Sequence, residues 1–170
     1  WMISGIDEGP TAYVNLVEIK DNDTGLSLLQ KCMKKGVILV IKCIVDLLLG
    51  HDVPKLTPNK ELFHCYRTSH ARVPYILWNI MDQTDINNFI RAADYGPVES
   101  PTYSPKICYR EMELELKTKD IQCLPLFNHE AEPGEVVAID IDGVYVQCMV
   151  RSGILLIKSG QKLAENGKKT

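Results

Sequence analysis

The hydrophobic pattern of residues 1–50 predicts a strand followed by two helices. Residues 11–19 (TAYVNLVEI) are rich in the residue types that favour strands. Residues 24–35 carry apolar side chains at helical spacing, and Gly36 is expected to separate them from an almost wholly apolar run at 37–49 (VILVIKCIVDLLL). Gly50 stands where a helix C-terminal cap is expected. The second helix is therefore predicted to be buried against a sheet, as in an α/β layer.

The remaining residues predict one short helix and then strands. Residues 51–83 contain three prolines and no long periodicity, which is typical of a connector. Residues 84–94 place apolar side chains at helical spacing, with Thr84 or Asp85 as the cap, and a turn-rich stretch follows at 95–105. Strands are predicted within 106–116, 134–150 and 152–158. Short strands joined by tight turns indicate a small barrel.

Composition and charge are those of an ordinary globular protein. The chain has 170 residues, of which 45% are hydrophobic and 24% charged, and its net charge is −3. This balance gives no bulk electrostatic reason to expect nucleic-acid binding. The apolar run at 37–49 is shorter than the ~20 residues that a membrane span needs and contains Lys42 and Asp46, so no membrane association is predicted. No secretory leader is recognised, and a cytoplasmic protein is expected.

The cysteines and acidic turns do not predict a metal site. The six cysteines are scattered, with no Cys-x-x-Cys pair. Cys32 and Cys43 fall in apolar helical patterns, where buried reduced thiols are expected. Asp140 begins a run similar to a calcium loop, but the twelfth position is Arg151 rather than glutamate. A hairpin turn accounts for that run.

Asp7 is the one candidate for chemistry that the residues themselves offer. The four histidines lie in the connector or in a loop, with no triad order around a nucleophile and no glycine-rich phosphate loop in the sequence. Asp7 follows a short apolar stretch and precedes the Glu8-Gly9-Pro10 turn. Its carboxylate either serves a site or caps its own backbone in the turn. The residues alone leave both interpretations open.

Several motifs occur in the order in which one enzyme family carries them. The first four are the Asp7-Glu8-Gly9-Pro10 turn, the Asp23-Thr24 helix start, Gly36 and Gly50. With them, residues 6–50 resemble the C-terminal part of the catalytic domain of the folate-dependent formyltransferases, which include methionyl-tRNA formyltransferase and the sugar N-formyltransferases. Residues 78–94 (WNIMDQTDINNFIRAAD) are similar to the family's Ile-Asp-Trp segment and the helix behind it. Residues 132–148 (EPGEVVAIDIDGVYVQC) are similar to the Pro-Gly strand and Asp-Gly hairpin of its C-terminal barrel domain.

The resemblance implies an α/β protein in three parts. Residues 1–50 would be the tail of a Rossmann-like formyltransferase domain, 51–83 a linker, and 84–170 a small C-terminal barrel-like domain. The aspartate of the family's Ile-Asp-Trp motif is missing, since this chain has Ile76-Leu77-Trp78. In addition, 95–105 replaces a more aromatic Pro-Trp-Pro-Gly-Ala turn. These departures leave the acceptor substrate open.

The resemblance also implies a reaction. The family moves a formyl group from 10-formyltetrahydrofolate, its co-substrate, to an amine through an intermediate with a negative oxygen. Asp7 matches the family aspartate, which orients and charges a histidine and helps to remove the amine proton. The residues implied to contact the folate are Ile3, Ser4, Gly5, Ile6 and Gly9. The family's Asn-x-His segment lies upstream of this aspartate, so the 170 residues alone are expected to be inactive.

Charge and topology favour different acceptors. From residue 80 onward ten Lys or Arg stand against fourteen Asp or Glu, which favours a sugar-nucleotide or other small-molecule amine over tRNA. The barrel-like domain instead favours the tRNA branch of the family. A homodimer is a possible form of the protein.

Two other functions fit the sequence. The C-terminal part could be a non-catalytic module that binds a partner protein through exposed Tyr103, Tyr109 and Tyr145. The chain could also be an inactive fragment that aggregates through the uncovered apolar faces of its two predicted helices. An Asn-x-His segment upstream of Asp7 would favour the enzyme, and its absence would favour the module.

Overall fold

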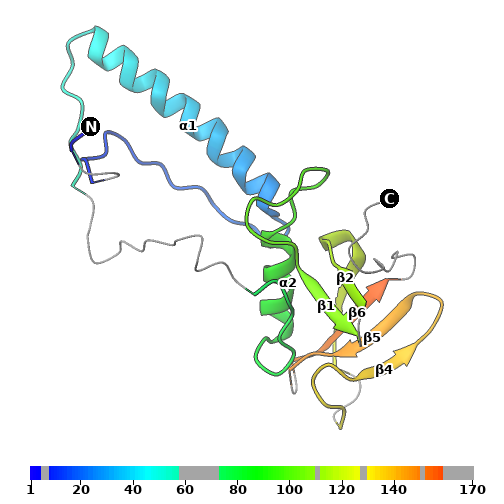
Figure 1. Ribbon diagram of the computed structural model, residues 1–170. Coiled ribbons are helices and arrows are strands. Elements are labelled where there is room, and N and C mark those ends of the chain that lie inside the picture. The colour runs from blue at the N-terminus through cyan, green and yellow to red at the C-terminus, as the bar shows by residue number, and fades with distance from the viewer. Residues whose placement is uncertain (5–7, 58–72, 110–111, 127–129, 150–151, 159–170) are drawn as a thin grey trace. The chain divides into compact units, whose positions relative to one another are not determined.

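The computed structural model describes residues 1–4, 8–57, 73–109, 112–126, 130–149 and 152–158. Contacts divide the chain into two units, which are described separately. Unit 1 comprises Trp1–Asn22 and Ser27–His70, and unit 2 comprises Asp23–Leu26 and Ala71–Thr170. Figure 1 shows a long helix with extended chain in unit 1, and a shorter helix with strands in unit 2.

The helix of unit 1 is α1 (Gly25–Leu48), whose first two residues belong to unit 2. It begins directly after Thr24, as predicted, but it runs without a break through Gly36. A Cβ at Gly36 would meet no atom within 4 Å, so packing does not require glycine at this position. A single helical glycine costs only about 1 kcal/mol relative to alanine, which the favourable residues around it offset. The predicted separation into two helices is therefore wrong.

Gly50 closes α1, as predicted. Its φ is +72°, a conformation that glycine adopts without strain. The N–H of Gly50 donates to the carbonyl of Leu47 (3.2 Å), and the N–H of His51 donates to the carbonyl of Asp46 (2.8 Å). This pair of bonds is a Schellman motif, which satisfies carbonyls that the end of a helix leaves without partners.

The apolar half of α1 lies on the surface. No residue of α1 is buried, and Val37, Ile41 and Leu48 expose 57%, 56% and 81% of their surface. The prediction of a helix buried against a sheet is therefore wrong for this chain. Among the described residues, no helix combines the length and apolarity that crossing a bilayer requires.

The predicted strand at 11–19 does not form. Only Thr11 takes part in β pairing, as an isolated bridge to Leu56, and the rest of the segment is irregular. Residues that favour strands need cross-strand neighbours to hold them in place. The described part of unit 1 offers this segment no strand to pair with beyond that bridge.

The helix of unit 2, α2 (Gln83–Ala92), lies where the apolar spacing predicted it. Its buried residues are Ile86, Phe89 and Ile90. The cap is Asp82, rather than Thr84 or Asp85 as predicted. A carboxylate oxygen of Asp82 accepts from the N–H of Asp85 (2.8 Å), and the Asp85 carboxylate accepts from the N–H of Asp82 (3.4 Å). This reciprocal capping box fixes the start of the helix.

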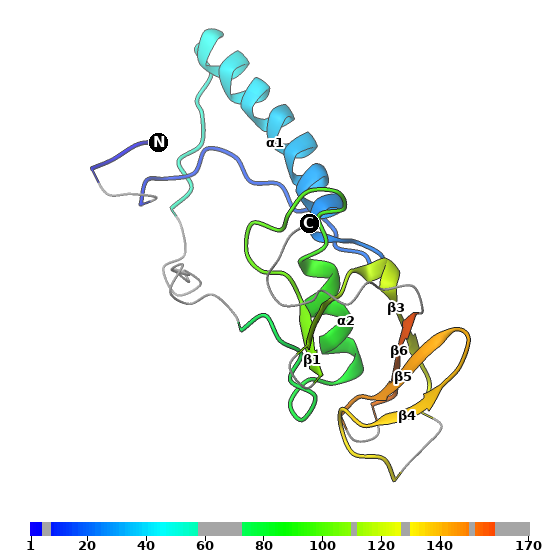
Figure 2. The same cartoon turned by 45° about the vertical axis from the view of Figure 1, so that its right-hand side comes forward.

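The strands of unit 2 form two antiparallel sheets. β1 (Lys106–Tyr109) pairs with β2 (Met112–Glu115). The second sheet has the order β3-β6-β5-β4, which can be followed in Figure 2. Its strands are β3 (Ile121–Leu124), β4 (Val136–Ile139), β5 (Gly143–Gln147) and β6 (Ile154–Lys158), and a 3-10 helix, η3 (Thr118–Asp120), precedes β3. Among the described residues β3 and β4 are the outer strands of this sheet and do not pair with each other, so the predicted barrel does not close.

The turn between β4 and β5 confirms the predicted Asp-Gly hairpin. One carboxylate oxygen of Asp140 accepts from the N–H of Asp142 (2.8 Å) and from that of Gly143 (3.3 Å). The N–H of Asp140 donates to the carbonyl of Gly143 (3.0 Å). The acidic run is thus explained by the turn that it forms.

The core of unit 2 lies between α2 and the strands. Its central residues include Ile86, Ile90, Leu116 and Leu155, of which none is more than 1% exposed. Gln83, the first residue of α2, donates from its side chain to carbonyls at the ends of β3 and β6, at 2.7 Å each. These bonds tie the helix to the larger sheet, because buried backbone carbonyls need such partners.

Two tyrosines that were predicted to be exposed are partly buried. The ring of Tyr103 stacks on Phe89 with 4.6 Å between centroids, and its hydroxyl donates to the carbonyl of Phe89 (2.9 Å). Tyr145 is also partly buried. The side chain of Tyr109 lies outside the described residues. Tyr103 therefore belongs to the packing of unit 2 rather than to a free binding surface.

Candidate functional site

The chain around Asp7 and a pocket in unit 2 are the two candidate sites. Three of the predicted site residues lie outside the described residues: Asp7, Gly5 and Ile6. Ile3 and Ser4 are described and exposed, with 51% of the surface of Ile3 accessible. Gly9 is described and partly buried. The role of Asp7 therefore stays a prediction, while the geometry of its neighbours is defined.

Gly9 packs so closely against the start of the chain that no side chain fits there. A Cβ at Gly9 would lie 1.7 Å from the carbonyl oxygen of Trp1. The main-chain nitrogen of Trp1 donates to the carbonyl of Pro10 (2.7 Å). The chain before residues 5–7 and the chain after them are therefore held together, and the close approach of the two backbones requires glycine.

The same segment is fastened to the chain that follows α1. The indole Nε1 of Trp1 donates to the carbonyl of Pro54 (3.0 Å). Thr11 and Leu56 exchange two backbone hydrogen bonds of 2.9 Å each. The Lys55 ammonium lies 4.9 Å from the centroid of the Trp1 ring, a cation–π contact. Both flanks of residues 5–7 thus rest on the chain after α1.

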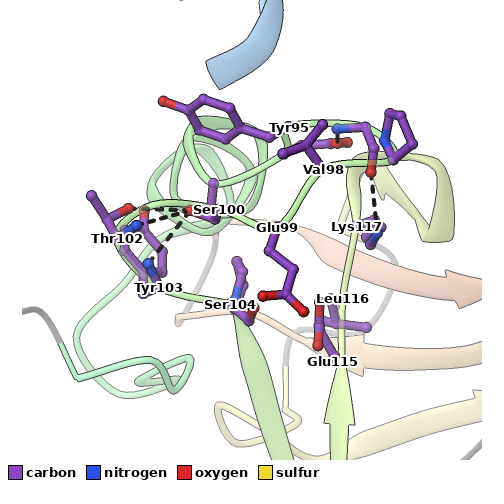
Figure 3. Close-up of a pocket in the computed structure, with 15 residues that line it drawn as sticks. Tyr95, Val98, Glu99, Ser100, Thr102, Tyr103, Ser104, Glu115, Leu116 and Lys117 are labelled. Carbon is purple, nitrogen blue, oxygen red and sulfur yellow. Dashed lines mark hydrogen bonds between the residues drawn. The ribbon is translucent and has the colours of Figure 1, made fainter.

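Unit 2 contains a pocket of about 420 Å³ between the 95–105 loop and the chain at the end of β2 (Figure 3). Ser100 organises the loop, since its hydroxyl accepts from the N–H groups of Thr102 and Tyr103 at 3.4 Å each. Tyr103 is fixed in turn by its contacts with α2. The wall of the pocket is therefore set by hydrogen bonds and packing within unit 2.

The ionisable side chains of the pocket are mainly acidic. Glu99 points into it toward Leu116, as Figure 3 shows, and Glu115 lies next to Leu116 at the end of β2. The Lys117 ammonium donates to the carbonyl of Gly96 (3.2 Å). The pocket can thus receive a small group that donates hydrogen bonds or carries positive charge.

Asp94 lines the same pocket and holds the loop in place. Burial raises the pKa of its carboxyl group, but hydrogen bonds from Gly96 and Thr118 outweigh burial, and the pKa falls below its usual range. One oxygen accepts from the N–H of Gly96 (2.9 Å) and the other from the N–H of Thr118 (3.2 Å). Because both oxygens are engaged, Asp94 positions the backbone rather than a ligand.

Sequence reasoning did not identify this pocket. It contains none of the residues predicted for catalysis or folate binding. The available signal was the turn-rich stretch at 95–105, whose pattern predicts a turn but no pocket. Loops held on a packed scaffold often carry binding residues. The sequence pattern, however, does not show that the end of β2 faces the 95–105 loop.

The cysteines and histidines that the structure describes do not form a second candidate site. Among the described residues no group of three or more His, Cys, Asp or Glu is placed to hold a metal ion. Cys32 is exposed and Cys43 partly buried, so the prediction of two buried thiols is wrong. Burial raises the pKa of Cys148 to about 12. Nδ1 of His51 lies 3.2 Å from Asp46, and the other three histidines are outside the described residues.

Comparison with known proteins gives matches along almost the whole chain. The chain is 28% identical over 163 residues to a methionyl-tRNA formyltransferase of Nitrosospira multiformis, covering 95% of this chain and 49% of that protein. It is 28% identical over 163 residues to the one of Methylacidiphilum infernorum, covering 95% and 48%. Over 144 residues it is 28% identical to the one of Kosmotoga olearia, covering 85% and 43%. The chain thus spans about half the length of these relatives.

A solved structure gives a matching fold. HypX from Aquifex aeolicus, in a variant form, superposes with a TM-score of 0.57 at 16% identity, covering 91% of this chain and 26% of that chain. At this identity the likeness concerns the fold alone. No protein-family profile matches the sequence. The three sequence relatives confirm that the chain resembles a C-terminal portion of the formyltransferases.

Proposed function

We propose, from this resemblance to a C-terminal portion of the formyltransferases, that the chain is part of an enzyme that transfers a formyl group from 10-formyltetrahydrofolate to an amine. The observation that carries the proposal is the match over 95% of the chain to proteins about twice its length. A match that includes both units fits a chain that supplies one part of an active site and the domain attached to it.

In this reaction the acceptor amine attacks the formyl carbon, and a bond from nitrogen to carbon forms. The bond between the formyl carbon and the folate nitrogen then breaks. The attacking nitrogen loses a proton and the folate nitrogen gains one. We assign Asp7 the task of orienting and charging a histidine that takes part in these transfers. That histidine and an asparagine that stabilises the oxyanion would come from outside these 170 residues.

The packing around Gly9 supports a role for the turn that follows Asp7. A side chain at Gly9 would collide with the carbonyl of Trp1, so the position is restricted to glycine by the local backbone. We infer that this turn presents Asp7 and that the backbone of residues 3–6 lies against the pterin ring. A folate site of this kind needs a backbone that a ligand can approach closely. The close packing of Gly9 on Trp1 fixes the backbone next to it.

The surface of α1 supports the view that a further part of the enzyme covers it. The second half of α1, from Val37 to Leu48, is almost wholly apolar, and apolar helix surface is normally buried. Ile38, Ile41 and Ile44 are all more than half exposed in this chain. We infer that the half of the formyltransferase length that this chain does not match covers this helix in the complete enzyme.

The acceptor is either a small amine or the amino group of methionyl-tRNA. The named activity of the sequence relatives favours methionyl-tRNA. The excess of acidic residues after residue 80 favours a small-molecule or sugar-nucleotide amine, because tRNA binding relies on contacts to phosphate. Both acceptors therefore belong in one experiment.

The test is a binding and activity assay on the longest polypeptide that contains this chain. A stable analogue, 5-formyltetrahydrofolate, is titrated by calorimetry, and formyl transfer from 10-formyltetrahydrofolate is followed with each acceptor. We expect folate binding, formyl transfer to one acceptor, and a rate about 10²–10⁴ lower for Asp7→Asn. The same titration on the 170 residues alone should show little or no binding.

The matched control is Asp142→Asn, which changes an exposed carboxylate in the β4–β5 turn. This variant should bind folate and transfer formyl at the rate of the parent protein. Absence of folate binding in every form would overturn the proposal. In that case the chain would be better explained as a binding module.

A further inference from the structure

Asp46, in the last turn of α1, is surrounded by three donors from three parts of unit 1. Its Oδ2 accepts from the hydroxyl of Tyr13 (2.6 Å) and from the ammonium of Lys42 (2.7 Å). Its Oδ1 lies 3.2 Å from Nδ1 of His51. The Asp46 side chain is only 15% exposed, although the helix around it is open to solvent. These side chains cover the carboxylate.

The placement of Asp46 runs against the pattern of its own helix. Residues 44–49 are otherwise entirely apolar, and a carboxylate there interrupts the most hydrophobic stretch of the chain. Positions that break a local rule are often explained by function or by a specific contact. Here the contact is with Tyr13, which comes from a segment with no regular structure of its own.

Asp46 also holds the chain that leaves the helix. Its backbone carbonyl accepts from the N–H of His51 (2.8 Å), while its carboxylate faces the imidazole of the same residue. His51 is therefore fixed at two points. The direction in which the chain continues toward residues 54–56 is set by this residue together with Gly50.

Three contacts thus join the segment before α1 to the end of α1 and the chain that follows it. Tyr13 is bound to Asp46, Thr11 exchanges two backbone bonds with Leu56, and the Trp1 indole donates to Pro54. The first segment is the one that carries residues 5–7, and its described flanks make these contacts. Of these three contacts, the one between Tyr13 and Asp46 attaches the segment to α1 itself.

The charges around the carboxylate keep it ionised. Hydrogen bonds from Lys42, Tyr13 and His51 hold the pKa of Asp46 well below its usual range. The Lys42 ammonium also lies 4.7 Å from the centroid of the Tyr13 ring. The contact therefore combines a charge-assisted hydrogen bond with a cation–π interaction, both of which depend on Tyr13 staying in place.

We propose that Asp46 is a positioning residue, which with Tyr13 and His51 fastens the described flanks of residues 5–7 to the C-terminal end of α1 and thereby sets the turnover of the enzyme. The inference rests on the proposed formyl transfer. Asp46 does not touch the substrates in this role. It acts through Tyr13 and through the chain after His51.

A simpler role for Asp46 would be an ordinary helix ion pair. Lys42 and Asp46 are four residues apart, a spacing at which opposite charges stabilise a helix. That role needs neither Tyr13 nor His51. The two interpretations therefore differ in what Tyr13→Phe should do, because this change removes only the hydroxyl and leaves the ion pair.

The experiment measures turnover and amide exchange in the longest polypeptide that contains this chain. The variants are Tyr13→Phe, Asp46→Asn and Asp46→Glu. We expect kcat to fall about 10-fold or more for Asp46→Asn and several-fold for Tyr13→Phe, with little change in KM, since a small displacement of a catalytic turn lowers the rate more than binding. Asp46→Glu keeps the charge and should recover part of the rate.

Hydrogen exchange at residues 9–13 supplies the second readout. It should become faster in Tyr13→Phe and Asp46→Asn, because the segment loses its attachment to α1. The matched control is Tyr75→Phe, which removes a tyrosine hydroxyl that donates to Glu113 in unit 2. This control should change neither kcat nor exchange at residues 9–13.

Each outcome has a distinct meaning. If the parent enzyme transfers formyl groups and Tyr13→Phe keeps full kcat, the inference is overturned while the proposed function stands. An equal loss of kcat in Tyr75→Phe would also overturn it, since the effect would then be general destabilisation. If the parent polypeptide transfers no formyl group, the proposed function fails, and the catalytic part of this inference fails with it.

Discussion

Unit 2 buries its apolar residues, whereas the apolar residues of α1 in unit 1 lie on the surface. In unit 2, Ile86, Ile90 and Leu155 are fully buried between α2 and the sheet. In unit 1, Ile38 and Ile41 expose more than half of their surface although they belong to a longer and more apolar helix. The residue types are the same in both places, so the difference comes from what surrounds them.

The partners of a helix, rather than its own hydrophobicity, decide whether it is buried. α2 precedes the strands that cover it, and Gln83 ties it to β3 and β6 within about seventy residues of chain. The described part of unit 1 provides no sheet for α1. We therefore expect unit 2 to unfold as a cooperative unit and α1 to contribute little to that transition.

The largest expected effect is the cost of a core truncation in unit 2. Ile90→Ala should lower the free energy of unfolding by about 3 kcal/mol, because it removes fully buried methyl groups and leaves a cavity. Ile41→Ala on α1 should change it by less than about 0.5 kcal/mol. Urea unfolding followed by the fluorescence of Trp78, which packs against the core, measures both. Equal losses would show that the two units are not independent.

A second test uses the exposed face of α1. Ile41→Lys combined with Leu48→Lys should lower self-association of the chain, because large exposed apolar patches favour association. Sedimentation velocity at several concentrations measures the change. Ile139→Lys, at an exposed position of β4, is the matched control and should leave association as it was. Unchanged association in the double variant would locate the contact elsewhere.

A smaller effect is expected at the helix caps. Asp82→Ala should lower the stability of unit 2 by about 1 kcal/mol, since it removes the capping box of α2. Asp82→Ser should keep most of that stability. Gly50→Ala in unit 1 replaces a glycine with φ of +72° and should fray the end of α1, seen by hydrogen exchange, without moving the Trp78 transition. A shift of that transition would contradict the separation of the two units.

The parts of the fold that could be predicted are those whose partners are close in sequence. The apolar spacing that predicted α2 falls within its own ten residues, although the cap is Asp82 rather than Thr84 or Asp85. The β4–β5 hairpin is encoded by Asp140 and Gly143. The strand at 11–19 and the buried helix at 37–49 were wrong because both predictions assumed a sheet that the described part of unit 1 does not contain. β3 was not among the predicted strands.

The candidate site was predictable only through its motif. The resemblance to the formyltransferases came from the Asp7-Glu8-Gly9-Pro10 turn and later segments, and the comparisons confirm it. The assignment of Asp7 itself stays a prediction. The cluster at Asp46 was not predictable, because Tyr13 and His51 meet it only through the fold. The one sign of this cluster in the sequence was the presence of Asp46 within the apolar run at 37–49.

The two units also contain similar polar clusters. In unit 1 the Asp46 carboxylate accepts from Tyr13 and Lys42, and in unit 2 the Glu113 carboxylate accepts from Tyr75 and from Lys106 (2.7 Å). Asp46 has a third partner in His51, whereas among the described residues Glu113 has only Tyr75 and Lys106. The clusters therefore allow the effect of one additional donor to be measured in a single chain.

Removing the lysine from each cluster should affect the pKa values of the two carboxyl groups differently. Hydrogen bonds from Lys106 and Tyr75 lower the pKa of Glu113, so its stabilisation is present above the unfolded value of about 4.3 and is lost as the pH falls through the folded value. Lys106→Met should raise the pKa of Glu113 toward that unfolded value. Lys42→Met should raise the pKa of Asp46 but leave it below its unfolded value of about 3.9, because Tyr13 and His51 still donate. Carboxyl carbon shifts in NMR titrations report each group directly, and a complete return of Asp46 to its unfolded value would mean that Lys42 alone holds the charge.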